Sequence, residues 1–233
     1  MLGELRAVVF DVDGTLADTE RDIHRPAFNQ AFARRGLAYH WDEAEYGRLL
    51  GITGGRKRIL RYLVEQDHPG DREALATDLH DTKTDLFIER ITRGPLLARE
   101  GAVAVLDGLE AAGVLIAVCT TGRSGWVMSL LERLFGLDRF AVIVTGDDVA
   151  ALKPEPDAYH LVLHRLGVPA ASAQAVEDSH NGLVAARQAG LGCWIVRNEY
   201  TADHDFTGAL GVFDSFTEPA GLTARRLLAR SGR

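Results

Sequence analysis

The spacing of hydrophobic and polar positions changes along the chain and divides it into three parts. Residues 6–10 form a short run of β-branched and apolar side chains, followed at once by polar turn residues, which predicts a buried strand. From about residue 20 to residue 93, apolar residues recur at helical spacing and no segment is typical of a strand. From residue 101 onward, short apolar runs alternate with amphipathic segments. This alternation predicts a parallel sheet covered by helices on both faces.

The middle part predicts a block of helices. The first helix carries an apolar stripe made of Ile23, Ala27, Phe28, Ala31 and Phe32. Three further helices are expected over residues 42–50, 57–65 and 71–91. Asp42 is the expected N-terminal cap of the second helix, and Gly94-Pro95 ends the block.

The last part predicts four helix–strand pairs. The expected helices cover residues 102–112, 124–135, 157–166 and 181–189, and the strands 114–119, 141–144, 173–176 and 193–196. The strand at residues 6–10 should join this sheet, so the helical block is an insertion. The predicted division is a core of residues 1–19 and 95–233 with a helical domain of residues 20–94.

Composition narrows the classes of function. The 233 residues are 46% hydrophobic and 25% charged, which is ordinary for a globular protein. The net charge of −7 argues against broad nucleic-acid binding, so an anionic substrate would need a local basic patch. No apolar run approaches the ~20 residues of a membrane helix, and the first strand leaves no room for a signal peptide. Cys119 and Cys193 lie within predicted strands, which favours free thiols. We therefore expect a cytoplasmic monomer that binds neither nucleic acid nor membrane.

The segment Asp11–Thr15 carries the first candidate chemistry. Asp11 and Asp13 stand two positions apart after the first strand, so both carboxylates face one small volume, and Gly14 allows a sharp bend after them. A divalent cation would relieve their repulsion. A strand end with an acidic turn is the plain alternative. A calcium loop fits poorly, because such loops carry glycine at the sixth position between two helices.

Three more polar clusters follow predicted strands and should lie at the same edge of the sheet. These are Thr120-Thr121-Gly122, Lys153-Pro154 and Glu177-Asp178-Ser179. Each has a structural alternative: Thr120 as a helix cap, Lys153 as a solvated charge, and the acidic pair as an N-terminal cap. Together, at equivalent strand ends, they favour a shared active site.

The combined set suits phosphoryl transfer, which needs a nucleophile, an acid and positive charge around the phosphoryl oxygens. Asp11 can attack phosphorus, and Asp13 can protonate the leaving oxygen and then activate water. Lys153 and Thr120 can hold the phosphoryl oxygens. The predicted Mg²⁺ site involves Asp11, Asp13 and Asp178, with Glu177 behind these residues, because Mg²⁺ prefers oxygen ligands.

These motifs resemble the haloacid dehalogenase superfamily of phosphohydrolases. The matching elements are Asp11–Thr15, Thr120, Lys153–Asp157 and Glu177–Ser179 followed by Asn181-Gly182. The resemblance spans the whole core and implies a Rossmann-like sheet, an inserted helical cap, magnesium and an aspartyl-phosphate intermediate.

Within the superfamily, the chain resembles the branch of β-phosphoglucomutase and the CbbY-type phosphatases. The segment Thr53–Ile59, His80 with Lys83-Thr84, and Tyr200-Thr201 with His204 and Phe206 carry this likeness. It implies a sugar bisphosphate such as xylulose 1,5-bisphosphate as substrate. Residues 20–27 are one residue longer than the resemblance leads us to expect, so His24 should face differently.

The helical domain adds a basic cluster that can hold a second phosphate. Arg56, Lys57 and Arg58 follow Gly54-Gly55, where backbone amides and a helix N-terminus can approach an anion. A solvated helix end is the plain alternative. The expected substrate contacts are Glu20, Arg56, Arg58, Lys83 and Thr121.

Three other functions stay open at this point. A phosphomutase would use Asp11 and Asp13 in the same way, and a phosphoglycolate-type phosphatase would share the core motifs. A silent binding protein would have lost at least one motif residue, and every motif residue is present.

Overall fold

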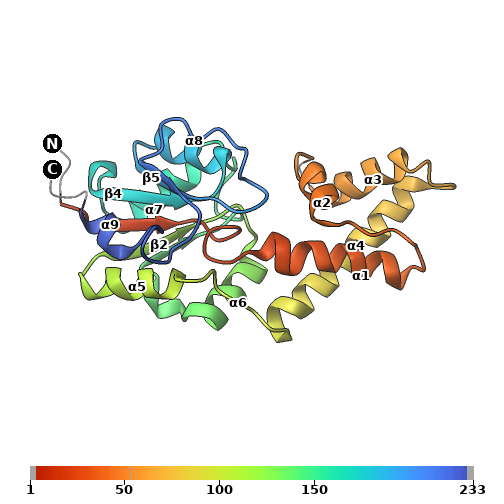
Figure 1. Cartoon of the computed structure of the whole chain (residues 1–233), viewed down its shortest axis with the longest axis horizontal. Coiled ribbons are helices and arrows are strands. Elements are labelled where there is room, and N and C mark those ends of the chain that lie inside the picture. The colour runs from red at the N-terminus through yellow and green to blue at the C-terminus, as the bar shows by residue number, and fades with distance from the viewer. Residues whose placement is uncertain (1–3, 53, 230–233) are drawn as a thin grey trace. The chain divides into compact units, whose positions relative to one another are not determined.

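The computed structural model of the chain describes residues 4–52 and 54–229 (Figure 1). Thr53, which opens one of the segments quoted above, lies outside the described residues. The chain forms two compact units. The first comprises the described residues up to Asp18 and from Leu96 onward, and the second is Thr19–Pro95. Both divisions lie one residue from the predicted limits.

The first unit is built on a six-stranded sheet whose strands pair in parallel in the order β3-β2-β1-β4-β5-β6. The strands are β1 Ala7–Phe10, β2 Leu115–Cys119, β3 Val142–Val144, β4 Ala173–Glu177, β5 Gly192–Val196 and β6 Gly211–Phe213. The predicted α/β fold is confirmed, and β1 joins the sheet as expected. The sequence pattern missed β6, because only three residues carry it and none is fully buried.

Helices cover both faces of this sheet, with α5 and α9 on one side and α8 on the other (Figure 1). The helices and 3₁₀ turns of the unit are α5 Ala102–Ala111, α6 Ser124–Phe135, η2 Leu137–Arg139, α7 Asp157–Leu166, η3 Ala170–Ser172, α8 His180–Gln188 and α9 Ala224–Ala229. Tyr159 and Val162 of α7 and Leu183 of α8 pack with strand residues in one buried core. Both cysteines are free and buried, as predicted.

The second unit is helical. Its elements are the π-helical turn η1 Glu20–His24, α1 Arg25–Arg34, α2 Glu43–Leu50, α3 Gly55–Glu65 and α4 Arg72–Arg93. Asp42 caps α2 as predicted, since its carboxylate accepts from the Glu45 backbone nitrogen at 2.8 Å. Asp71 caps α4 in the same way, accepting from the Ala74 nitrogen at 3.0 Å.

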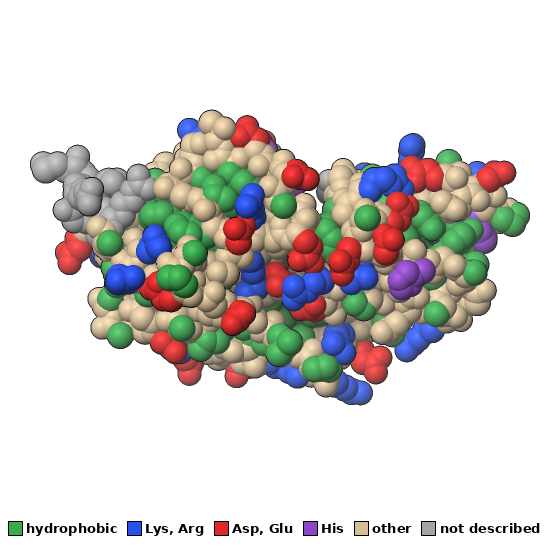
Figure 2. All heavy atoms as spheres, viewed as in Figure 1, with side chains coloured by type: hydrophobic (Ala, Val, Ile, Leu, Met, Phe, Trp, Pro, Cys, Tyr) green, Lys and Arg blue, Asp and Glu red, His purple; other side chains and the backbone are tan. Residues whose placement is uncertain are grey.

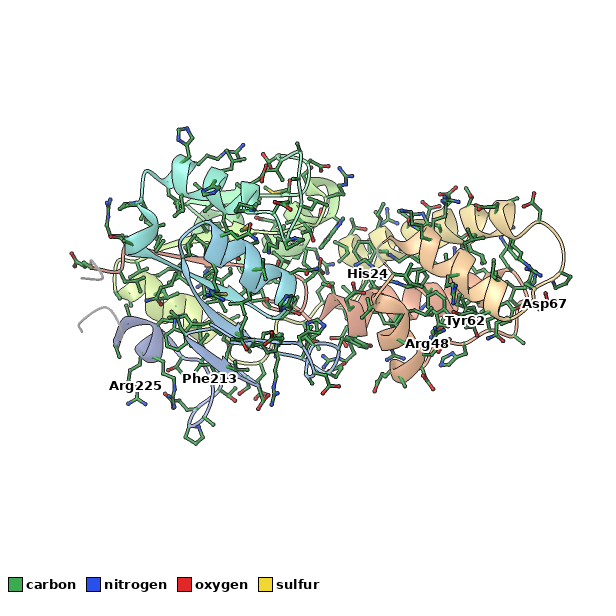
Figure 3. All side chains as sticks on the ribbon, turned by 90° about the horizontal axis from the view of Figure 1, so that it is seen from above. His24, Arg48, Tyr62, Asp67, Phe213 and Arg225 are labelled. Atoms are coloured by element: carbon green, nitrogen blue, oxygen red, sulfur yellow. The ribbon has the colours of Figure 1, made fainter. Side chains whose placement is uncertain are left out.

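An aromatic cluster holds the helices of this unit together. The rings of Phe32, Trp41 and Tyr62 pack edge to face, with centroids 5.0 Å apart for Phe32–Trp41 and 5.3 Å for Trp41–Tyr62. Figure 3 shows Tyr62 directed among these helices and Asp67 in the connection after α3. On the face shown in Figure 2, charged side chains of both signs are intermixed.

The segment of residues 20–27, which is one residue longer than the resemblance leads us to expect, begins with the π-helical turn Glu20–His24. A π-helical turn closes its hydrogen bond over one residue more than an α-helical turn. In the helix α1 that follows this turn, the apolar residues Ala27, Phe28, Ala31 and Phe32 are all buried. Among the described residues, each helix is too short or too polar to span a bilayer.

Candidate active site

The register of the sheet brings the predicted motifs to one edge. Phe10 of β1 pairs with Val118 of β2 and with Val176 of β4. The residues that follow these partners are Asp11, Cys119 and Glu177, so they emerge side by side at the carboxyl ends of three neighbouring strands. The backbone nitrogen of Asp11 donates to Val176 O at 3.0 Å, which fixes Asp11 against β4.

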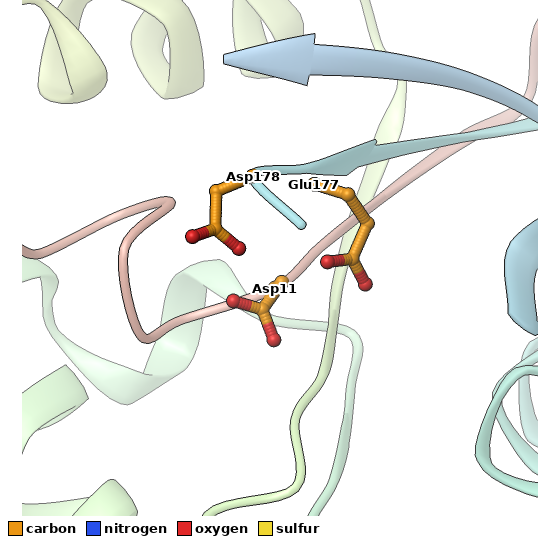
Figure 4. Close-up of side chains that lie close together, drawn as sticks. All are labelled: Asp11, Glu177 and Asp178. Carbon is orange, nitrogen blue, oxygen red and sulfur yellow. The ribbon is translucent and has the colours of Figure 1, made fainter. Parts of the chain in front are cut away.

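Three buried carboxylates converge at this edge (Figure 4). Asp11, Glu177 and Asp178 each offer an oxygen within 4.8 Å of the others. Asp13, which the sequence analysis predicted as a metal residue, is not one of these three, whereas Glu177, predicted to lie behind the ligands, is. The residue Asp13 is half-buried in the turn after β1.

Lys153 neutralises part of this negative charge. Its ammonium group donates to Asp11 Oδ1 at 2.7 Å, to Glu177 Oε1 at 2.6 Å and to Cys119 O at 2.7 Å. The Lys153 side chain is only 5% exposed. Burial alone would lower the pKa of Lys153, but the Asp11 and Glu177 charges outweigh it and hold that pKa well above its usual value. The plain alternative of a solvated lysine is thereby excluded.

Glu177 occupies a pocket shaped by a glycine. Its Oε1 also accepts from Tyr159 Oη at 2.5 Å, and its Oε2 is buried without a hydrogen-bond partner among the described residues. A side chain at Gly182 would overlap this carboxylate. Burial raises the pKa of Glu177 to about 7, with the Lys153 charge opposing the rise. Burial, and then the charges of Asp11 and Glu177, also raise the pKa of Asp178 well above its usual value.

These features fit a divalent cation. Three carboxylates face a single ammonium group, and a buried carboxylate oxygen is left without a donor. Burial and mutual repulsion disfavour the ionised form of these carboxylates. A cation that prefers oxygen ligands would stabilise that form. The acidic cluster is therefore a candidate metal centre.

The turn after β1 is tight and depends on Gly14. Val12 O accepts from the backbone nitrogens of Thr15, Leu16 and Ala17 at 3.2, 3.0 and 3.1 Å. Gly14 has a φ of +80°, which L side chains rarely adopt. Its α-carbon also packs so closely on Asp178 that a side chain would collide with the carboxylate.

Thr120 and Thr121 lie at the end of β2. Thr120 is buried, its backbone nitrogen donates to Val144 O at 3.0 Å, and its Oγ1 accepts from the Gly122 nitrogen at 3.0 Å. The helix that follows begins with Arg123 in the N-cap position, so Thr120 is not the cap of α6. Thr121 is exposed.

The helical unit holds a second cationic cluster, which Arg58 and Lys83 share with Phe28. Arg58 is 8% exposed and Lys83 is 7% exposed, and both cations lie over the Phe28 ring, at 5.9 and 4.9 Å from its centroid. Arg58 donates to Tyr46 Oη at 3.2 Å, and Tyr46 Oη in turn donates to Glu20. Three of the predicted substrate residues, Glu20, Arg58 and Lys83, thus belong to one cluster.

His24 contacts this cluster, whereas Arg56 lies outside it. Lys83 Nζ donates to His24 Nδ1 at 2.7 Å, and the His24 ring stacks on Phe87 at 4.2 Å (His24 is labelled in Figure 3). Burial, followed by the Lys83 and Arg58 charges, lowers the pKa of His24 well below its usual value. Arg56 instead pairs with Glu73 at 2.7 Å, with its side chain 44% exposed. The structure therefore does not bring Arg56 together with Arg58 and Lys83.

Three residues at the site were not found from the sequence. Tyr159 donates to Glu177, Asn198 Nδ2 donates to Asp178 Oδ2 at 2.8 Å, and Arg99 Nη1 donates to Gly14 O at 2.6 Å. Asn198 lies two residues after the end of β5, so the rule that identified the other strand-end clusters would have found it. Arg99 and Tyr159 carry no comparable signal.

Comparison with known proteins identifies the family to which the chain belongs. Residues 5–190 match the haloacid dehalogenase-like hydrolase family, and the chain belongs to this family. It is 43% identical to protein CbbY of Cereibacter sphaeroides over 97% of this chain and 98% of that relative. It is 33% identical to a phosphoglycolate phosphatase of Rhodospirillum rubrum over 91% of this chain and 88% of that protein.

Solved structures agree with this assignment. CbbY from Rhodobacter sphaeroides in complex with phosphate superposes with a TM-score of 0.78 at 43% identity, covering 94% of this chain and 97% of that one. A CbbY mutant from the same organism, in complex with xylulose 1,5-bisphosphate, gives 0.77 at 42% identity over the same shares of the two chains. The chain is therefore a hydrolase whose motifs and fold match those of the CbbY proteins.

Proposed function

We propose that the chain is a Mg²⁺-dependent phosphatase of small sugar bisphosphates, with xylulose 1,5-bisphosphate as the candidate substrate. The observation that carries this proposal is the buried group of Asp11, Lys153, Glu177 and Asp178 at the carboxyl edge of the sheet. The similarity to a CbbY mutant in complex with that bisphosphate supports the choice of substrate. The unit Thr19–Pro95 then acts as the cap domain.

Asp11 is the proposed nucleophile. One of its carboxylate oxygens attacks phosphorus, the bond from phosphorus to the sugar oxygen breaks, and an aspartyl phosphate forms. Asp13 gives its proton to the departing sugar oxygen. It then removes a proton from a water molecule that attacks the phosphoryl group, which releases phosphate and restores Asp11.

The remaining residues hold charge in place. Lys153 and the Thr120 hydroxyl are the proposed contacts of the phosphoryl oxygens, and Thr121, which directly follows Thr120, is a further proposed substrate contact. Asp11 and Asp178 would hold Mg²⁺ with Asp13 nearby, while Glu177 keeps Lys153 in position. When bound, Mg²⁺ supplies positive charge that offsets the carboxylates and the developing negative charge on the phosphoryl group.

The cluster around Phe28 is the proposed site of the second phosphate. Arg58 and Lys83 bring two buried positive charges together, and Glu20 orients Arg58 through Tyr46. Binding energy from a phosphate remote from the reacting bond can be used to align the substrate. This arrangement predicts a preference for bisphosphates.

Phosphate release from a panel of sugar mono- and bisphosphates, with Mg²⁺ and with a chelator, tests the proposal. We expect Mg²⁺-dependent release, with kcat/KM for xylulose 1,5-bisphosphate roughly 10²-fold or more above that for xylulose 5-phosphate, about 3 kcal/mol. Product analysis by ³¹P NMR separates hydrolysis from phosphoryl return to a sugar. An isomerised sugar phosphate without free phosphate would identify a mutase, and equal rates for all esters would remove the bisphosphate assignment.

A further inference from the structure

The backbone carbonyl of Gly14 lies between two side chains that the proposed mechanism does not use. Arg99 Nη1 donates to it at 2.6 Å, and Asn198 Nδ2 lies 3.4 Å from it. The same Asn198 nitrogen donates to Asp178 Oδ2 at 2.8 Å. One amide group therefore joins the turn that follows Asp13 to the carboxylate of Asp178.

The contacts at this point leave little room for movement. A Cβ atom at Gly14 would collide with the Asp178 carboxylate and with the Asn198 amide. All three residues are thus in close contact, and Asp178 is only 7% exposed. A change in the Asn198 side chain would therefore be transmitted to the orientation of the Asp178 carboxylate.

The orientation of the Asn198 amide is fixed by its own loop. Its Oδ1 accepts from the Tyr200 backbone nitrogen at 2.9 Å, and its backbone nitrogen donates to Thr201 Oγ1 at 3.0 Å. Because the oxygen is used by the loop, the NH₂ group is the end that faces Asp178. The loop therefore presents a hydrogen-bond donor to the carboxylate rather than an acceptor.

Arg99 anchors the loop that carries Asn198 to the Gly14 carbonyl. Besides Gly14 O, its guanidinium donates to Val196 O at 2.7 Å and to Arg197 O at 2.9 Å. Its side chain is 8% exposed, and its Nε lies 3.4 Å from Asp18 Oδ1. The end of β5 and the start of the loop that carries Asn198 are thereby tied directly to the turn after β1.

We propose that Asn198 is a positioning residue for Asp178, and that Arg99 holds the loop that presents it. The proposal rests on the proposed role of Asp178 as a metal ligand. A carboxylate with one oxygen held by a fixed donor keeps a single orientation toward a cation. Partners of this kind typically contribute about 10- to 100-fold to metal affinity.

Calorimetric titration of the chelator-treated protein with Mn²⁺, without substrate, tests this proposal independently of turnover. We expect Asn198→Ala to weaken Mn²⁺ binding by about 10- to 100-fold. Asn198→Ser keeps an oxygen for the Tyr200 nitrogen but does not reach Asp178, so it should weaken binding by a similar factor while preserving the loop. Arg225→Ala is the control, because Arg225 lies in the same unit but is exposed and pairs with Glu218 at 3.2 Å. It should leave the Mn²⁺ affinity within about two-fold of the parent.

The outcomes separate this proposal from the proposed function. If both Asn198 variants bind Mn²⁺ as tightly as the parent while Asp178→Ala does not, Asn198 has no positioning role. If Asp178→Ala itself binds Mn²⁺ like the parent, the metal assignment fails and the positioning role fails with it. Arg99→Lys should weaken binding in the same direction, and its effect should be less than additive with Asn198→Ala because both act through one loop. Full additivity would show that Arg99 acts elsewhere.

Discussion

Lys153 and Asp11 are 142 positions apart in the chain, yet the Lys153 ammonium lies 2.7 Å from Asp11 Oδ1 inside the protein. The same ammonium group contacts Glu177, so one cation holds two buried carboxylates. An unpaired buried carboxylate is strongly disfavoured in its ionised form. Lys153 therefore places a positive charge directly against Asp11, the proposed nucleophile, and against Glu177.

Asp11→Asn should abolish turnover, with a loss of roughly 10⁴-fold or more, because an amide cannot form the acyl phosphate. The amide oxygen can still accept from Lys153, so the fold should be retained. Steady-state phosphate release, together with a thermal unfolding curve, measures both effects. Asp107→Asn, which changes an exposed carboxylate paired with Arg139, is the control. Near-normal turnover of freshly prepared Asp11→Asn, with deamidation excluded by mass spectrometry, would refute the assignment.

The convergence of Asp11, Lys153, Glu177 and Asp178 could be predicted because each lies at or beyond the carboxyl end of a strand of one parallel sheet. Alternating apolar runs locate the strands, and parallel pairing places their carboxyl ends at a common edge. Residues that stabilise the site from elsewhere give no such signal. Arg99 lies before α5, and its role depends on carbonyl groups of three separate segments.

The basic residues of the helical unit show why closeness in sequence does not predict which side chains lie together. Their closeness in sequence predicts one cluster for Arg56 and Arg58, but residues two apart on an α-helix point about 200° apart. One of them faces the Phe28 cluster and the other faces Glu73. The partnership of Lys83 with His24, 59 positions away, depends on how α4 packs against α1 and η1, which periodicity alone does not specify.

The metal-free protein should lose stability as the pH rises, because Glu177 binds its proton more tightly in the folded state. Its pKa is about 7 when folded and 4.5 in the unfolded chain. The stabilising contribution is therefore complete below the unfolded value and is lost as the pH rises through the folded one. Asp178, whose pKa is also raised, acts in the same direction.

Glu177→Gln isolates this contribution. Between about pH 5 and pH 8, the unfolding free energy of the chelated parent should fall relative to that of the variant, by an amount on the order of 3 kcal/mol. Denaturant unfolding at several pH values measures the difference, with Glu110→Gln, an exposed carboxylate, as the control. Mg²⁺ should remove much of the decline in the parent, since it stabilises the ionised carboxylates. Parallel pH profiles for parent and Glu177→Gln would contradict the raised pKa.

Gly14→Ala should both strain the backbone and displace the Asp178 carboxylate. A second glycine with positive φ, but without a neighbour at its Cβ position, separates the two effects. Gly14 has a φ of +80°, and a methyl group there would collide with Asp178 and Asn198. Gly167 is also left-handed, with a φ of +64°, but has open space around its Cβ position. Both alanine variants should lose about 1–2 kcal/mol from backbone strain. Only Gly14→Ala should also weaken Mn²⁺ binding, by about 10-fold or more as Asp178 is displaced. Equal Mn²⁺ affinity in the two variants would show that the contact with Asp178 is unimportant.

The charges of Lys83 and Arg58 around Phe28 are the proposed contacts of the second phosphate. Lys83→Met keeps much of the aliphatic length of the side chain over Phe28 but removes the charge, and Arg58→Met does the same on α3. Each should lower kcat/KM for xylulose 1,5-bisphosphate by roughly 10²-fold, about 3 kcal/mol, because one charge-assisted contact with phosphate is lost. Hydrolysis of xylulose 5-phosphate should change by less than about three-fold, since the reacting phosphate depends on Asp11 and Lys153. Arg56→Met is the matched control on the same helix, because its guanidinium pairs with Glu73 at 2.7 Å. It should leave both rates near those of the parent.

If Arg56→Met lowers the bisphosphate rate as much as Arg58→Met does, the basic residues act as a diffuse charge rather than as a defined site. If both substrates suffer equally in Lys83→Met, with its thermal unfolding unchanged, then Lys83 serves the reacting phosphate and the second-phosphate site is refuted.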